Sequence, residues 1–320
     1  YGIHESICNW IEDFSSNRSQ RVIVNNCSSN WLPCTSGVAQ GSVLGPILFL
    51  IYVNDLPDCI ENSDIFLYAD DAKILKRIDN MHDCLLLQRD VNAFAAWCDL
   101  WQLKLNIAKC VYIRYGSARR PTFVYCITSV PLQEVSFTKD LGVIFDSRLV
   151  FSEHCNAIVS KGFARANMLL KCFYSRDRSL QIRLFNTFVR PVLEYNSPIW
   201  SPHLNKNVIS VERVQRYFTK SLRGLKDIPY NKRLTLLEQP SLEQRRTRAD
   251  LIFLYKILHG LVDPNLKKFF AGQTIYDTVR IFVTAPDTSH RLRGHVFKLQ
   301  APRPNSDLLK FDFVYRAISY

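Results

Sequence analysis

The chain has 320 residues, of which 47% are hydrophobic and 22% are charged. This composition excludes a disordered tail, and the length is enough to bury two hydrophobic cores, or one core with a substantial extension. The longest apolar run, residues 43–53, is interrupted by Gly45 and Pro46 and is shorter than the roughly 20 apolar residues of a membrane helix. The sequence therefore predicts a soluble protein.

Positive charge is concentrated in one part of the chain, whose formal net charge is +12. Residues 1–150 hold 13 basic and 16 acidic residues, residues 151–260 hold 19 and 8, and residues 261–320 hold 9 and 5. A block of positive charge is the electrostatic signature of a polyanionic partner. A solvated basic helical surface without a partner is the competing interpretation.

The cysteines and the first residues bear on the cellular compartment. Ten cysteines all lie at or before Cys172, and no two of them have the Cys-x-x-Cys spacing. This pattern favours reduced, mostly buried thiols in an intracellular protein over disulfides or a zinc site. The first residues contain no initiator Met, basic leader or long apolar segment, so we expect no secretory signal and a start within a domain.

Strand-like and helical patterns alternate in the first half of the chain. Residues 21–25 predict a strand, and residues 26–36 a turn-rich connection. Pro46 suits the first turn of a helix that continues to Leu56, where Pro57 would end it. The expected elements that follow are a hairpin over 65–75, a helix over 91–101 with one face on the sheet, and strands over 111–115 and 141–145. Together they predict an α+β domain over residues 1–150.

Helical periodicity dominates after about residue 151. Apolar stripes predict helices over 158–169, 184–192 and 211–222, and a last helix runs from Leu242 to His259, closed by Gly260. Residues 151–260 thus predict an all-α domain, followed by a polar extension over 261–320. The basic residues expected on exposed helix faces are Arg213, Arg216, Lys220 and Arg223. Arg245 and Arg246 stand near a helix N-terminus, where positive charge is unfavourable, which suggests an external anion as their partner.

Asp70 and Asp71 are the sharpest chemical feature, because the hairpin pattern places both acids at a turn. Carboxylate oxygens are the ligands that Mg²⁺ prefers, and a tight turn can hold them at the end of rigid strands. Such a site would serve phosphoryl or nucleotidyl transfer. Asp is also a common residue in solvated turns, so the pair alone does not decide between the two interpretations.

The surrounding motifs resemble those of non-LTR retrotransposon reverse transcriptases, especially the Jockey and CR1-like groups. Residues 37–56, which include Ala-Gln-Gly-Ser, and the Phe-Leu-Tyr-Ala-Asp-Asp run at 66–71 resemble the adjoining B and C motifs of that family. Further similar stretches are 103–110 (D motif), 141–146 with 151–154 (E region), and the helical segments 193–200, 212–216 and 242–246. The resemblance therefore covers nearly the whole chain.

The resemblance implies a partial polymerase palm, with a small antiparallel sheet and packed helices, followed by a basic thumb-like domain. It implies a Mg²⁺-dependent RNA-directed DNA polymerase whose partners are an RNA template, a DNA primer and nucleotides, acting in the nucleus and cytoplasm. By this resemblance, Asp70 and Asp71 would be metal ligands, and Tyr68 and Ala69 would contact the primer end. Gln40 and Gly41 would contact the nucleotide and the template. Lys109 would stabilise charge on the pyrophosphate or act as a general acid. An exposed lysine without a role is the competing interpretation of Lys109.

The sequence departs from the family at two places. Ala39 stands where the family usually has Pro, which should loosen a turn without removing a chemical group. The family's A motif, which carries the partner aspartate, would precede Tyr1, so we expect weak metal binding and little polymerase activity from these residues alone. A non-catalytic nucleic-acid binder, as a decayed or host-used copy, remains the alternative. A metal nuclease would leave the Gln-Gly-Ser segment and the basic helices unexplained.

Overall fold

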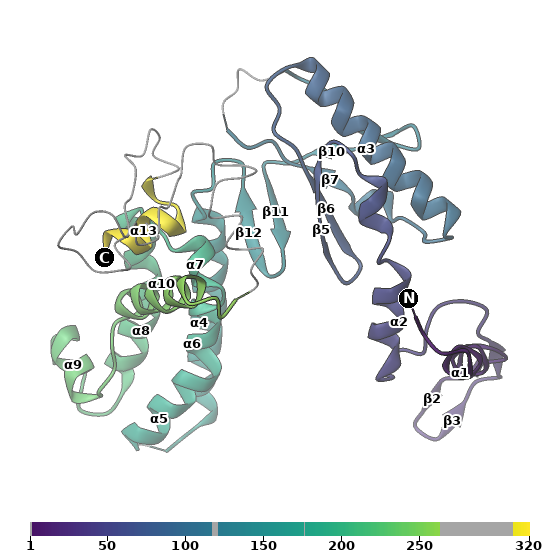
Figure 1. Cartoon of the computed structure of the whole chain (residues 1–320). Helices are drawn as coiled ribbons and strands as arrows, with labels where there is room; N and C mark the ends of the chain where they lie inside the picture. The colour runs from purple at the N-terminus through teal and green to yellow at the C-terminus, as the bar shows by residue number, and fades with distance from the viewer. Residues whose placement is uncertain (1, 117–120, 176, 263–309) are drawn as a thin grey trace, which may run out of the picture. The chain divides into compact units, whose positions relative to one another are not determined.

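The computed structural model describes residues 2–116, 121–175, 177–262 and 310–320 (Figure 1). The chain divides into two compact units, residues 1–110 with 119–133, and residues 111–118 with 134–320. The second unit includes the hairpin before residue 150 because that hairpin packs on the first long helix of the helical part. Most of the extension expected over residues 261–320 lies outside the described residues.

The first unit starts with one helix and two small hairpins. The elements are α1 (Glu5–Ser15), β1 (Ser19–Gln20), β2 (Ile23–Val24), β3 (Cys27–Ser28) and β4 (Leu32–Pro33), with β1 antiparallel to β4 and β2 to β3. The strand expected over residues 21–25 is therefore shorter, and the connection expected over 26–36 contains two more strands. Asn25 and Asn26 explain the early turn, because both have positive φ (48° and 64°), as a two-residue type I′ turn requires.

The helix expected from Pro46 to Leu56 is two elements. Helix α2 spans Leu44–Tyr52, and a short 3-10 helix, η1, spans Leu56–Cys59. Val53 is the C-cap of α2, and its backbone N–H donates to the carbonyl of Phe49 at 3.0 Å. Pro57 lies in the first turn of η1, where a missing N–H leaves no hydrogen bond unmade. Pro57 therefore starts a turn, and the prediction that it ends the preceding helix is wrong.

The hairpin predicted over residues 65–75 is confirmed. Strand β5 (Asp64–Tyr68) pairs antiparallel with β6 (Asp71–Leu75), and α3 (Met81–Leu100) follows. Ile65 and Leu67 pack on a core that contains Trp97 of α3, so the predicted contact between this helix and the hairpin is also confirmed. Helix α3 begins ten residues earlier than expected, at a capping box formed by Asn80 and Asp83.

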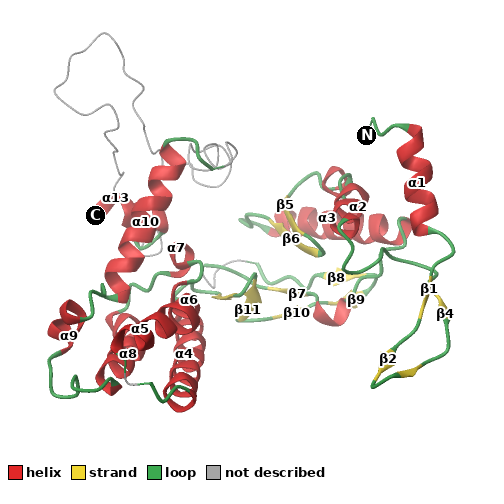
Figure 2. Cartoon of the chain, turned by 90° about the horizontal axis from the view of Figure 1, so that it is seen from below, coloured by secondary structure: helices red, strands yellow, loops and turns green. Residues whose placement is uncertain are grey.

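The described strands pair only two by two, in separate sheets (Figure 2). One such pair, β8 (Cys126–Ile127) with β9 (Val130–Pro131), is held to α3 by Gln88. The side-chain amide of Gln88 donates to the carbonyl of Cys126 at 2.7 Å and accepts from its N–H at 2.8 Å. This mixture of helices and small sheets agrees with the predicted α+β class.

The second unit contains short strands and a cluster of helices. Its strands include β11 (Phe137–Asp140) and β12 (Val143–Asp146), which form a hairpin, while β7 (Val111–Tyr112) and β10 (Gln133–Glu134) lie at the boundary with the first unit. The expected strand over 141–145 starts later, because Leu141 and Gly142 have positive φ and form the turn. The helices are α4 (Ser152–Cys172), α5 (Arg178–Leu184), α6 (Arg190–Glu194), α7 (Ser197–Trp200), α8 (Asn205–Ser221), α9 (Tyr230–Leu236), α10 (Leu242–Leu258) and α13 (Phe313–Ser319).

The helix expected over residues 184–192 is interrupted. A π-helical turn, η3 (Phe185–Val189), lies between α5 and α6. Pro191 explains the change, because it has no N–H to continue the α-helical ladder. Arg165 of α4 donates to the carbonyl of Phe188 at 2.9 Å within this turn. The helix expected over 242–259 is confirmed and begins with a capping box formed by Ser241 and Gln244.

The core of the second unit lies where α4 and α8 cross beside α6. Trp200, Phe185, Phe218 and Leu193 are among its fully buried side chains. Gly162 of α4 permits this close packing, because a Cβ at this position would lie 2.8 Å from Leu193 of α6 and 3.2 Å from Val214 of α8. Among the described residues, no helix is both long and apolar enough to cross a membrane.

Candidate active-site hairpin and nucleic-acid interface

The two acids lie at the tip of the β5–β6 hairpin. Tyr68 pairs with Asp71 in the register, so the loop has only two residues, Ala69 and Asp70. Ala69 has a φ of 51°, a left-handed conformation that costs an L-residue about 1–2 kcal/mol. Both acidic side chains are exposed. The tip thus presents two carboxylates to solvent from a short, strained turn.

The two faces of this hairpin differ. Ile65 and Leu67 face the core, whereas Phe66 and Tyr68 on the other face are 44% and 64% exposed. Because residues paired across a register share a face, the side chain of Asp71 lies on the same face as Tyr68. An exposed aromatic ring, on which a base can stack, therefore stands beside a carboxylate.

Substituting Gly for Ala69 tests the strain at the tip. Gly adopts positive φ without a steric penalty, so we expect Ala69→Gly to raise the free energy of unfolding of the first unit by about 0.5–1 kcal/mol. Ala72, in the middle of β6, is the matched control. Ala72→Gly should lower the free energy of unfolding by a similar amount. Urea unfolding measures both variants, and a loss of stability in Ala69→Gly contradicts the strained turn.

Gln40 and Gly41 form the turn before α2. Gly41 has a φ of 83°, and a Cβ at this position would meet open space, so Gly is needed there for its backbone conformation. The side chain of Ser42 stabilises the turn by accepting from the N–H of Gly45 at 3.0 Å and donating to the carbonyl of Ala39 at 2.7 Å. Gln40 is exposed, so its amide is available for an external partner.

Lys109 is the last residue of η2 (Ile107–Lys109) and is exposed. The structure brings Tyr68, Ala69, Asp70 and Asp71 together at one tip. Within the described chain, no hydrogen bond or ion pair connects that tip with Gln40, Gly41 or Lys109, which lie elsewhere in the first unit. The described residues also contain no group of three or more His, Cys, Asp or Glu side chains that could hold a metal ion.

Helix α8 carries a basic stripe along its exposed face. The members are Lys206, Ile209, Arg213, Arg216, Tyr217 and Lys220, whose spacing places them on one side of the helix. All six are exposed, and no acidic residue interrupts the stripe. We refer to these six residues of the helix as the α8 stripe. Arg223, which is not one of them, is exposed just beyond the helix end. Sequence analysis missed Lys206 and Tyr217, which helical spacing from Arg213 would have found.

Arg245 and Arg246 have a different environment. Arg245 forms a two-pronged contact with Glu194, with Nη2 at 3.0 Å from Oε2, and these hydrogen bonds raise the pKa of Arg245. Arg246 is only 3% exposed, and burial lowers its pKa. A buried guanidinium cannot contact an external phosphate in this conformation. The position of Arg245 near a helix N-terminus is thus explained by a carboxylate within the protein.

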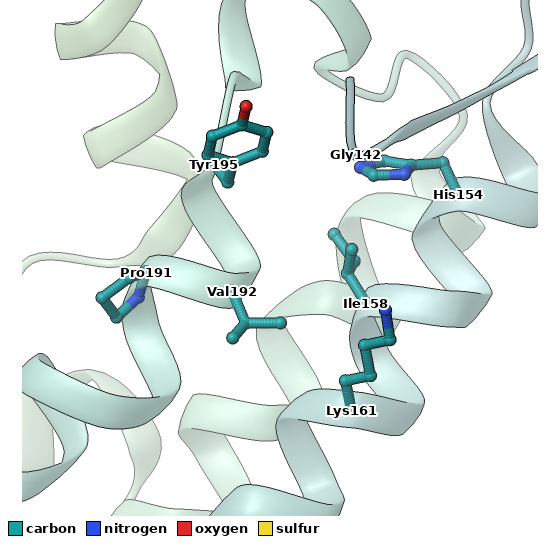
Figure 3. A pocket seen from close by; sticks show the side chains of 7 residues that line it. All are labelled: Gly142, His154, Ile158, Lys161, Pro191, Val192 and Tyr195. Carbon is teal, nitrogen blue, oxygen red and sulfur yellow. The ribbon is translucent and has the colours of Figure 1, made fainter. Parts of the chain in front are cut away.

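A pocket in the second unit contains none of the predicted site residues. It has a volume of about 280 Å³ and is lined by Gly142, His154, Ile158, Lys161, Pro191, Val192 and Tyr195 (Figure 3). Tyr195 donates its hydroxyl to the carbonyl of Leu141 at 3.2 Å and so holds the tip of the β11–β12 hairpin. The ring of His154 lies on the opposite side of the pocket from Tyr195.

The chain is similar to known reverse transcriptases, and the family match covers its first part. Residues 2–145 match the family described as reverse transcriptase (RNA-dependent DNA polymerase). The chain is 24% identical over 245 residues to the RNA-directed DNA polymerase from mobile element jockey of Drosophila melanogaster, covering 72% of this chain and 26% of that protein. It is 28% identical over 253 residues to the probable RNA-directed DNA polymerase from transposon BS of the same species, covering 75% and 27%.

Residues 2–145 thus match a reverse transcriptase domain. This match, together with the relatives from mobile elements, confirms the resemblance to reverse transcriptases of non-LTR, LINE-type retrotransposons that the motifs indicated. A third relative, the probable RNA-directed DNA polymerase from transposon X-element of D. melanogaster, is 28% identical over 198 residues, covering 59% of this chain and 22% of that protein. The chain spans about a quarter of the length of the curated relatives it matches.

Proposed function

We propose that the chain is part of an RNA-directed DNA polymerase that performs two-metal nucleotidyl transfer when complete. The observation that carries the proposal is the pair of carboxylates, Asp70 and Asp71, at a two-residue hairpin tip within the region that matches the reverse transcriptase family. In this proposal residues 1–150 form a partial palm, and residues 151–260 form a basic thumb-like domain. An RNA template, a DNA primer and nucleotides are the partners.

The hairpin tip would hold Mg²⁺ and the primer end. Exposed carboxylate oxygens on a short turn are the donors that Mg²⁺ prefers, so Asp70 and Asp71 fit this ion. When bound, Mg²⁺ would neutralise phosphate charge and lower the pKa of the attacking hydroxyl. Tyr68, beside Asp71, would contact the sugar or base at the primer end, and Ala69 sets the turn between them.

The incoming nucleotide would meet two further parts of the first unit. Gln40 and Gly41 would line the pocket for the nucleotide and template, because the backbone at Gly41 is open to close approach and Gln40 offers both a donor and an acceptor. Lys109 would place its ammonium group near the pyrophosphate, where positive charge stabilises the leaving group.

The α8 stripe is the proposed contact with the template–primer duplex. Arg213, Arg216 and Lys220 present three positive charges within about 11 Å along the helix, given a rise of 1.5 Å per residue. Such contacts to phosphates give affinity without sequence preference and depend strongly on salt. Arg223 extends the same surface. We leave Arg245 out of this contact because it binds Glu194, and Arg246 because its side chain is buried.

We further infer that the 320 residues alone bind metal weakly and extend primers little or not at all. Two adjacent carboxylates offer two Mg²⁺ ions fewer oxygen ligands than their octahedral coordination demands, even with phosphates contributing. The chain would then act as a nucleic-acid binder in isolation. A non-catalytic relic would also bind nucleic acid, so metal binding must be tested separately from nucleic-acid binding.

Metal binding at the tip is tested with Mn²⁺, whose binding to the chain is measured by electron paramagnetic resonance. We expect Asp70→Asn and Asp71→Asn each to weaken Mn²⁺ binding about tenfold or more, because each removes one charged ligand. The matched control is Asp64→Asn, at the other end of the same hairpin, which should bind Mn²⁺ like the unmodified chain.

The outcomes separate the alternatives. Equal losses in the Asp64 and Asp70 variants mean that the ion is not held at the tip, and the polymerase assignment of these acids is wrong. Binding of an RNA–DNA hybrid that requires the α8 stripe, with no metal at the tip, supports the non-catalytic binder. Primer extension by the chain that disappears in Asp70→Asn supports the polymerase and contradicts the inferred inactivity.

A further inference from the structure

Arg216 is held at two points by helix α9. Its guanidinium lies over the ring of Tyr230, with 4.7 Å between Cζ and the ring centroid. Its backbone carbonyl accepts from Nη2 of Arg233 at 3.2 Å. Among the described residues, the other basic side chains of the α8 stripe have no ion-pair or aromatic partner; these are Lys206, Arg213 and Lys220. Arg216 is therefore the cation of the stripe whose position the protein itself fixes.

The ring of Tyr230 is fixed in turn. Its hydroxyl donates to Oε1 of Glu212 and accepts from Nε2 of Gln215 at 3.2 Å. Glu212 is only 8% exposed and also accepts from the backbone N–H of Leu242 at 3.1 and 3.2 Å. Burial, and then the bond to Glu212, raises the pKa of Tyr230, so the phenol remains a donor at neutral pH. Glu212 of α8 thus connects Tyr230 of α9 with the start of α10.

Stacking on an aromatic ring leaves a guanidinium able to bind phosphate. The ring contacts the flat face of the guanidinium, whereas the N–H donors point outward in its plane. The side chain of Arg216 is exposed, so these donors are accessible. A side chain that is already held in place loses less conformational freedom when it binds a ligand, and this saving appears as affinity.

We propose that Arg216 is the preorganised contact of the α8 stripe with a phosphodiester backbone, and that Tyr230 is the residue that positions it. This proposal rests on the proposed binding of a template–primer duplex, and it ranks the basic residues of the α8 stripe by how firmly the protein holds them in place. Arg213, one turn earlier on the same face, carries the same charge without the same support. Tyr230 and Glu212 have no contact with the nucleic acid in this proposal and act only through Arg216.

A double-mutant cycle tests the proposal with the full chain and a fluorescein-labelled RNA–DNA hybrid duplex, titrated at several KCl concentrations. Tyr230→Leu should weaken binding about threefold, within the entropy cost of ordering one side chain that is no longer held in place, and leave the salt dependence unchanged because no charge is lost. Arg216→Ala should weaken binding more and lower the slope of log K against log salt by about one. In the Arg216→Ala background, Tyr230→Leu should have no further effect.

Two controls distinguish positioning from damage to the fold. Tyr230→Phe keeps the ring over Arg216 and should bind the duplex within about twofold of the unmodified chain, since only the hydroxyl is lost. In the Arg213→Ala background, Tyr230→Leu should still cost about threefold, because Arg213 does not contact Tyr230. Circular dichroism confirms that each variant is folded at the assay temperature.

Different results would overturn the positioning role of Tyr230 and the proposed duplex binding. If Tyr230→Leu weakens binding equally in the Arg216→Ala background, Tyr230 acts through the fold, and the positioning role is overturned while duplex binding stands. If the duplex does not bind, or binds with no loss in either arginine variant, the proposed interface on α8 is wrong and the role of Arg216 is overturned with it.

Discussion

Replacing Asp250 with Asn is expected to lower the free energy of unfolding of the helical unit by about 3–5 kcal/mol. The side chain of Asp250 is fully buried, and its carboxylate accepts from Nε of Arg316 at 2.7 Å and from Nη2 at 3.2 Å. The substitution leaves the guanidinium of Arg316, which is only 12% exposed, without its counter-charge. A charge that is buried and unpaired costs far more than a surface charge.

Urea unfolding followed by circular dichroism measures the effect. The double variant Asp250→Leu/Arg316→Met is the informative control, because it removes both charges and should be more stable than Asp250→Asn alone. The exposed acid Glu243, on the same helix, provides the matched surface substitution, and Glu243→Gln should change stability by less than about 0.5 kcal/mol. An Asp250→Asn variant as stable as Glu243→Gln contradicts the buried ion pair between α10 and α13.

Stability should also depend on pH through His154. This residue is 2% exposed, its ring lies edge-on to Trp200, and its Nδ1 accepts from the N–H of Ile144 at 3.2 Å. Burial, and then the charge of Lys161, lowers the pKa of His154 to about 4. An unfolded His has a pKa of about 6.5. Between these two values the unfolded chain binds a proton that the folded chain does not, so stability falls as the pH falls.

The expected loss through His154 is about 3 kcal/mol between pH 6.5 and pH 4, from about 1.4 kcal/mol per pKa unit. His154→Asn should remove this dependence, because its side-chain oxygen can accept from Ile144 but does not titrate. The measurement is the free energy of unfolding at steps from pH 7 to pH 4 for both proteins. The curves should converge as the pH falls, and parallel curves would show that His154 is not held neutral by the fold.

Local signals in the sequence predicted much of the fold. Two apolar arms, residues 65–67 and 74–75, on either side of Asp70 and Asp71 specified the hairpin and its tip. The last helix was equally well specified, because its capping box and its apolar spacing lie within one segment. Strand lengths were predicted less well. They depend on turns such as Leu141–Gly142, where a bulky residue adopts positive φ that its type does not indicate.

Contacts between residues far apart in the chain could not be predicted from the sequence. Arg245 looked unsuited to its place near a helix N-terminus, but Glu194, 51 residues earlier in the chain, supplies its counter-charge. Tyr230 and Arg216 likewise meet only because α8 and α9 pack together. Most residues of the candidate site were found by motif and spacing, because hairpin tips and helix faces are local, although Lys206 and Tyr217 of the α8 stripe were missed. The internal partners of the arginines depend on tertiary packing, which no single segment encodes.

The central claim is that Asp70 and Asp71 hold a metal ion beside the primer end of a bound duplex. Replacing Mg²⁺ with Fe²⁺, in the presence of ascorbate and peroxide, tests it directly, because the hydroxyl radicals made at the ion cut the nearest nucleotides. We predict cleavage clustered at the primer 3′ end, present with Asp64→Asn and lost with Asp70→Asn/Asp71→Asn. Cleavage spread evenly along the duplex, or unchanged in the double variant, would contradict the account.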